Sequence, residues 1–114
     1  MANLPQETLA TLFTLQRRLF QIINLATAAE FKLAERYGET EETLLELEEL
    51  KNTAERARLS YNRLNALLLR VAESQPVATS ATINLLYQSI EQAQATAEAG
   101  EPSIQEVKRN WNLP

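Results

Sequence analysis

The sequence predicts an all-α fold, and three observations support this prediction. The 114 residues are rich in Ala, Leu, Glu, Gln and Arg, the residue types that favour helices. Only two Gly and four Pro are present. Apolar residues recur at spacings of three and four over long stretches. We expect a long antiparallel helical hairpin followed by a third helix and a short C-terminal helix, which together make a three- to four-helix bundle.

The first helix is expected over residues 5–37. Pro5 suits a first helical turn, Glu7 complements the helix dipole, and Gly38 suits the left-handed position that follows a helix. Its spacing is typical of the seam of a bundle or coiled coil. The seam consists of Leu12, Leu15, Leu19, Ile22, Ala26, Ala29 and Leu33.

The second helix is expected over residues 40–74. Thr40 is the predicted N-cap, and Thr43 at the third helical position predicts that no capping box forms. The helix should end before Pro76, because a residue that precedes proline resists the helical region. The predicted seam is Leu47, Leu50, Ala54, Ala57, Tyr61, Leu64, Leu68 and Val71.

The third helix is expected over residues 80–99, with Thr79 or Ser80 as its N-cap and Gly100 as its end. Its apolar residues are Ile83, Leu86, Ile90, Ala93 and Ala97. A short helix or tail is expected over residues 101–114. The bundle domain is therefore predicted to span residues 1–100.

The composition argues against an enzyme, a metal site and a cofactor. The chain has no His, no Cys and no Asp, so the usual acid–base, nucleophilic and metal-binding groups are missing. A glycine-rich phosphate loop cannot be built from two separated glycines. Glu30, on a mostly apolar helix, is expected to pair with Arg58 or Lys32 or to lie exposed.

The sequence also indicates a cytoplasmic protein without a membrane span. The first residues, MANLPQETLATLF, lack the basic start of a secretory signal. The longest weakly polar run, residues 19–29, is shorter than the roughly 20 residues that cross a bilayer.

The first helix carries more apolar surface than one neighbour can bury. Beyond its seam it has a second apolar set, which we interpret as a possible dimer interface: Phe13, Phe20, Ile23 and Phe31. A central core helix would explain the same pattern, because a helix that is apolar on several sides is often buried by several neighbours. We favour the interface, because two helices of about 50 Å are longer than a short third helix can cover.

The charge pattern supports self-association. Between Glu39 and Glu49 there are six Glu and no basic residue, which makes an acidic tip, whereas arginines gather near the middle of the hairpin. Two hairpins docked antiparallel would place acid against base twice. The same charges could simply complement helix dipoles and face solvent.

A possible partner patch combines arginines with the only Trp: Arg17, Arg18, Arg56, Arg63, Arg70 and Trp111. Three of these arginines share a seven-residue spacing and therefore form one stripe. Nucleic-acid binding is the less favoured role for this patch, because no aromatic residues are interleaved with the arginines and the net charge of the chain is −4. Trp111 is expected to dock on the bundle, and the alternative is an exposed anchor for a partner.

These observations predict a non-enzymatic helical-bundle protein that acts through protein–protein contact, as an adaptor, assembly factor or regulator, and forms a homodimer. The alternative is a nucleic-acid-associated accessory protein that uses the arginine patch. A third possibility, a bundle that binds a small ligand, requires a pocket lined by Phe13, Phe20, Phe31 and Tyr61.

Overall fold

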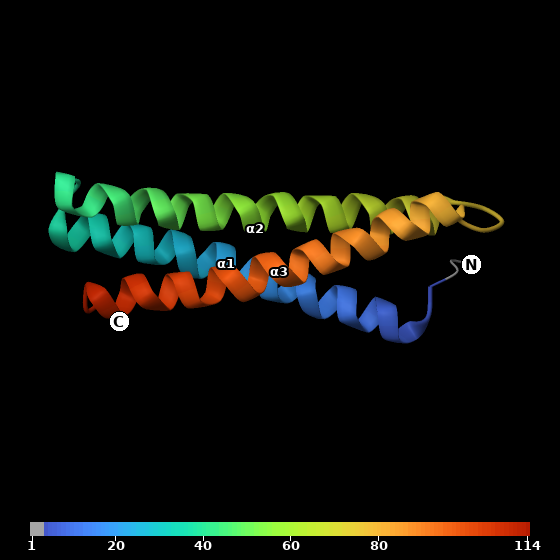
Figure 1. Cartoon of the computed structure of the whole chain (residues 1–114), viewed down its shortest axis with the longest axis horizontal. Helices are drawn as coiled ribbons and strands as arrows, with labels where there is room; N and C mark the ends of the chain where they lie inside the picture. Colours follow the sequence, from blue (N-terminus) through green and yellow to red (C-terminus); the bar gives the residue numbers. More distant parts are fainter. Residues whose placement is uncertain (1–3) are drawn as a thin grey trace.

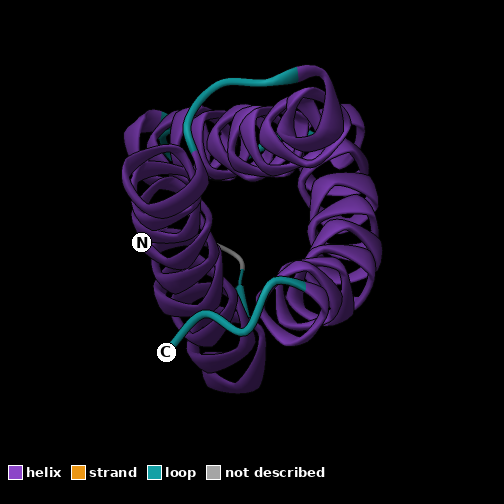
Figure 2. Ribbon diagram, turned by 90° about the vertical axis from the view of Figure 1, so that its left-hand side faces the viewer, coloured by secondary structure: helices purple, strands orange, loops and turns teal. Residues whose placement is uncertain are grey.

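The protein folds into three long helices, as the computed structural model of residues 4–114 shows. They are α1 (Gln6–Tyr37), α2 (Glu41–Glu73) and α3 (Ser80–Asn110). The predicted all-α bundle is confirmed, and the described part contains only helices and loops (Figure 2). α1 and α2 form the expected antiparallel hairpin, and α3 crosses α1 (Figure 1). The first three residues of the predicted 1–100 domain lie outside the described residues.

The bundle is long and thin. Its principal extents are 56 × 20 × 17 Å, and its radius of gyration is 17.1 Å. A compact domain of this length would have a radius of gyration of about 13 Å. The accessible surface is 7261 Å², whereas a compact monomer of this mass exposes about 6,300 Å². With only three helices around the core, each helix keeps one side in contact with solvent.

The ends of α1 follow the sequence closely. Pro5 is the N-cap, and its carbonyl accepts hydrogen bonds from the amides of Thr8 and Leu9. Gly38 follows the helix with a backbone φ of +79°, a conformation that residues other than glycine rarely adopt. Its amide donates to the carbonyl of Ala34 at 2.8 Å.

The N-terminus of α2 corrects the prediction that no capping box forms there. The amide of Thr43 donates to the Thr40 hydroxyl at 3.3 Å, and the amide of Thr40 donates to the Thr43 hydroxyl at 2.9 Å. The Thr43 hydroxyl also donates to the carbonyl of Gly38 at 2.8 Å. A buried threonine thus takes the role that glutamate has in the usual motif, because its hydroxyl can both accept and donate.

The predicted end of the third helix at Gly100 is wrong, and so is the separate short helix after it. α3 continues through Gly100 and Pro102 to Asn110. Gly and Pro cost about 1 and 3 kcal/mol inside a helix relative to Ala. Ile104 and Val107 extend the buried seam beyond these residues, and their packing outweighs that cost. Pro102 is exposed, so its ring does not enter the core.

Gly100 lies where the three helices meet. A side chain added there would lie 3.3 Å from the Thr53 methyl group of α2 and 3.5 Å from the Ile22 side chain of α1. The missing side chain therefore lets α3 approach both other helices closely. This role in packing, rather than a helix end, explains the glycine.

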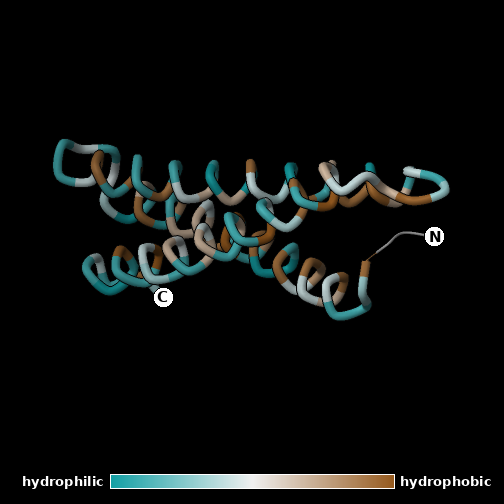
Figure 3. The backbone as a smooth tube through the Cα atoms, turned by 45° about the vertical axis from the view of Figure 1, so that its right-hand side comes forward, coloured by the Kyte–Doolittle hydropathy of each residue, from teal (hydrophilic) through white to brown (hydrophobic). Residues whose placement is uncertain are grey.

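The core follows the predicted seams with one shift. All seven seam residues predicted for α1 are buried. On α2, Ala54, Tyr61 and Leu68 are only half-buried, whereas Thr53 and Leu67 are buried. α2 packs against both α1 and α3, so its buried strip is wider than a two-helix seam and is displaced toward α3. Figure 3 shows apolar stretches along the interior and a largely hydrophilic hairpin tip.

Candidate functional site

The outer face of α1, the side opposite its buried seam, carries a line of exposed aromatic residues. Phe13, Phe20 and Phe31 are 54%, 62% and 65% exposed. Phe13 and Phe31 are 18 residues apart, which is five turns of an α-helix, and Phe20 lies between them close to the same line. We call these three residues the phenylalanine stripe. Single exposed apolar residues are common on proteins, whereas an aligned set on one face is a candidate contact surface.

The fourth residue predicted for this interface lies elsewhere. Ile23 is half-buried and packs at the margin of the core. Its position on the helix, three residues after Phe20, turns it about 60° away from Phe20. The central-core alternative does not hold for the stripe itself, because more than half of each phenylalanine remains accessible.

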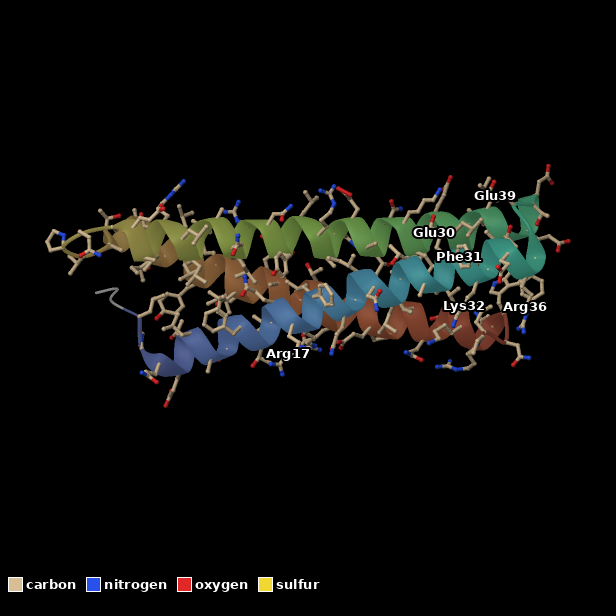
Figure 4. The ribbon with its side chains drawn as sticks, turned by 180° about the vertical axis from the view of Figure 1, so that it is seen from behind. Arg17, Glu30, Phe31, Lys32, Arg36 and Glu39 are labelled. Atoms are coloured by element: carbon tan, nitrogen blue, oxygen red, sulfur yellow. The ribbon has the colours of Figure 1, made fainter. Side chains whose placement is uncertain are left out.

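The two flanks of the outer face are tied to the neighbouring helices. Figure 4 shows Glu30 on the α2 side of α1, Lys32 and Arg36 on the α3 side, and Phe31 between them. Glu30 pairs with Lys51 of α2 at 3.6 Å, so the predicted partners Arg58 and Lys32 are wrong. Lys51 lies opposite Glu30 because an antiparallel hairpin brings the start of α2 beside the end of α1.

On the α3 side, Arg18 holds the carboxylate of Glu101. Its Nε and Nη2 atoms donate to the two carboxylate oxygens at 2.9 and 2.8 Å, a bidentate pair. The hydrogen bonds from Arg18 to Glu101 raise the pKa of the Arg18 guanidinium above its ordinary value. Arg18 therefore connects α1 to α3 and does not offer a free charge to a partner.

Two charges on the outer face have no ion-pair partner among residues 4–114. Arg17 and Glu35 are both exposed, and each follows a phenylalanine of the stripe, Phe13 or Phe31, by four residues. One helical turn after each phenylalanine, they lie on the same side of the stripe. The stripe is thus bordered by a base in its first half and an acid near its end.

The arginine stripe of α2 is partly used inside the chain. Arg63 Nε donates to the hydroxyl of buried Ser89 on α3 at 2.8 Å. Arg56 Nη2 lies 3.6 Å from a Glu49 carboxylate oxygen and 3.4 Å from the Thr53 hydroxyl. Arg70 is exposed. Two of the three arginines of this stripe are therefore already engaged in contacts inside the chain.

Trp111 docks on the bundle, the outcome that the sequence favoured. Its ring meets that of Tyr37 edge to face, with centroids 5.1 Å apart. The Tyr37 hydroxyl donates to the Trp111 carbonyl at 2.9 Å, and Arg36 donates to the carbonyl of Asn112 at 2.9 Å. These contacts tie the end of α3 to the end of α1, and the sequence contained no signal for this pairing.

The pocket required by the small-ligand alternative does not form. The phenylalanine stripe faces outward, whereas Tyr61 is half-buried against the core. Within residues 4–114 no group of three or more carboxylates could hold a metal ion, and no buried side-chain polar atom lacks a hydrogen-bond partner. In the same residues, no helix has the length and apolar character needed to cross a membrane.

Comparisons of the chain with protein-family models, with curated proteins and with solved structures found no match. The outer face of α1 is therefore interpreted from its own geometry.

Proposed function

We propose that this protein is a non-enzymatic, cytoplasmic helical-bundle protein that acts through protein–protein contact, as an adaptor, assembly factor or regulator, and forms a homodimer through the outer face of α1. The observation that supports the proposal is the phenylalanine stripe, three aligned aromatic residues that are more than half exposed. Covering apolar area of this kind is favourable by roughly 25 cal/mol per Å².

Substitution of the stripe tests this proposal. Phe20→Glu together with Phe31→Glu should leave helicity unchanged, because both side chains already face solvent. A two-fold interface contains each substitution twice, so we expect the dissociation constant of the dimer to rise at least about 100-fold. Sedimentation equilibrium of the wild type should show a mass that rises to two chains across the micromolar range, and the variant should remain a single chain.

A matched control comes from α2. Leu59 and Leu69 are 57% and 51% exposed, so Leu59→Glu with Leu69→Glu adds the same charge to a similarly apolar but different surface. This control should remain dimeric. A wild-type mass near 12.9 kDa at every concentration, or equal loss of assembly in the control, would overturn the proposal.

The nucleic-acid alternative receives less support from the arginines. Arg56 and Arg63 make contacts inside the chain, and Arg18 is occupied by Glu101. The alternative requires an oligonucleotide complex whose affinity falls steeply as salt rises. Sub-micromolar binding near physiological salt would reverse the order of the two functions.

A further inference from the structure

We infer that the occupant of the phenylalanine stripe is a second copy of this chain whose α1 runs antiparallel to the first, with the two-fold axis near the midpoint between Leu25 and Ala26. The inference rests on the proposed function, because it takes the stripe as the interface. It adds the direction and the register of the contact, which the existence of a dimer leaves open.

The positions of the aromatic residues define the register. Phe20 and Phe31 lie at equal distances on either side of that midpoint, about 8 Å along the helix at 1.5 Å per residue. In an antiparallel pair, Phe20 of one copy therefore faces Phe31 of the other, and the symmetry repeats this contact. Phe13 then lies over Gly38 of the second copy, the residue that follows α1.

The charges select the antiparallel direction. Arg17 and Glu35 also lie at nearly equal distances from the midpoint, about 13 and 14 Å, and on the same side of the stripe. An antiparallel pair brings Arg17 of each copy beside Glu35 of the other. In a parallel pair, two-fold symmetry would keep the two Arg17 side chains level with each other but on opposite edges of the contact, and likewise the two Glu35 side chains, so no base would meet an acid. Exposed pairs of this kind determine orientation more than affinity.

The centre of the face allows the two helices to approach. Asn24, Thr27 and Ala28 are small or medium-sized and exposed. The Thr27 hydroxyl donates to the carbonyls of Ile23 and Asn24 in its own helix, at 2.8 and 3.1 Å. A second copy can therefore cover Thr27 without leaving its hydroxyl proton unpaired.

The area available fits a reversible dimer. If a phenylalanine has a surface of about 200 Å², the exposed parts of the stripe in two copies amount to about 700 Å². A standard stable interface buries about 1,600 Å² in total, and the small residues between the phenylalanines supply part of the rest. We therefore expect a dissociation constant in the micromolar range.

Charge reversal tests the direction. In the antiparallel dimer, Arg17→Glu alone or Glu35→Arg alone places like charges together twice, and we expect each to weaken the dimer about 5- to 20-fold at low salt. The double variant restores both pairs and should return to within about 2-fold of the wild type. These differences should fade near 1 M salt. A parallel dimer gives neither the losses nor the rescue, and that result would overturn the inference.

Spin labels test the register, because the chain has no cysteine of its own. Thr14→Cys and Ala28→Cys are both exposed positions on α1. In the antiparallel dimer the labels at position 14 should lie about 35 Å apart along the axis, and those at position 28 less than about 15 Å. Short distances at both positions would contradict the antiparallel dimer, whereas a single-chain mass would contradict the proposed function itself.

Discussion

The outer faces of α1 and α2 carry similar amounts of exposed apolar surface but distribute it differently. On α1, Phe13, Phe20 and Phe31 follow one line, and the charges beside them, Arg17 and Glu35, lie to one side. The proposed contact surface on α1 therefore differs from the outer face of α2 in the alignment of its apolar residues and not in their number.

On α2, the exposed apolar residues are interrupted by charged ones. Leu44, Leu59 and Leu69 are each about half exposed, but Glu55 and Arg58 pair with each other between the first two. Covering these leucines would also strip water from a charged pair, which costs free energy. We therefore interpret the outer face of α2 as an ordinary solvated surface.

The largest expected effect on stability comes from comparing substitutions at two adjacent residues of α1, one on its buried face and one on its outer face. Leu19 is fully buried, so Leu19→Glu would place an unpaired charge in the core. The cost is several kcal/mol, comparable with the total stability of a domain of this size, roughly 5–15 kcal/mol. We expect circular dichroism to show loss of helix in Leu19→Glu and normal helicity in Phe20→Glu. Equal helicity in both would mean that the assigned faces of α1 are wrong.

A smaller effect is expected where the interior faces of α1 and α2 meet α3. Gly100→Val would push a branched side chain against Thr53 and Ile22, and overpacking of this kind costs about 1–3 kcal/mol. Urea unfolding should show this loss. Ala99→Val, at an exposed position one residue earlier, should lower stability by only about 0.5 kcal/mol, the difference in helix propensity between the two residues. Equal effects at both sites would contradict the close approach at Gly100.

The α3 side of α2 should tolerate loss of its arginines. Changing Arg56, Arg63 and Arg70 to Gln should lower stability by about 1–2 kcal/mol, mostly because Ser89 loses its hydrogen bond from Arg63. Helicity and the two-chain mass should remain. Complete unfolding would show that these arginines form an internal ion-pair network. Dissociation to single chains would show that the interface lies on α2 and not on α1.

The smallest effect concerns the charged pair on the outer face of α2. The hydrogen bond from Arg58 lowers the pKa of the Glu55 carboxyl below its ordinary value. A lowered pKa means that the pair contributes at neutral pH and is lost as the pH falls through that pKa. Arg58→Gln should raise the Glu55 pKa in an NMR titration with little change in melting. Arg70→Gln is the control, and it should leave Glu55 unchanged.

Several features could be predicted from the sequence because they depend on neighbours in the chain. The hairpin, the seam of α1 and the turn at Gly38 depend on periodicity and on local backbone preference. The phenylalanine stripe is also visible in the sequence as part of a second apolar set, whose fourth member, Ile23, is half-buried at the margin of the core. Periodicity shows which residues share a side of a helix, but it does not show how wide a strip the neighbouring helices cover.

Other features depended on contacts between residues far apart in the chain. Gly100 and Pro102 have weak helical preference, yet α3 continues through them because Ile104 and Val107 are buried against the other helices. The pairing of Arg18 with Glu101 follows from the path of α3, which no local pattern specifies.

The sequence by itself determined the class of fold and the buried seam of α1. Only the tertiary structure decided which apolar residues of α1 stay exposed. The physical reason is that three helices in a bundle 56 Å long cover the inner side of α1 and leave its outer side, with Phe13, Phe20 and Phe31, in solvent.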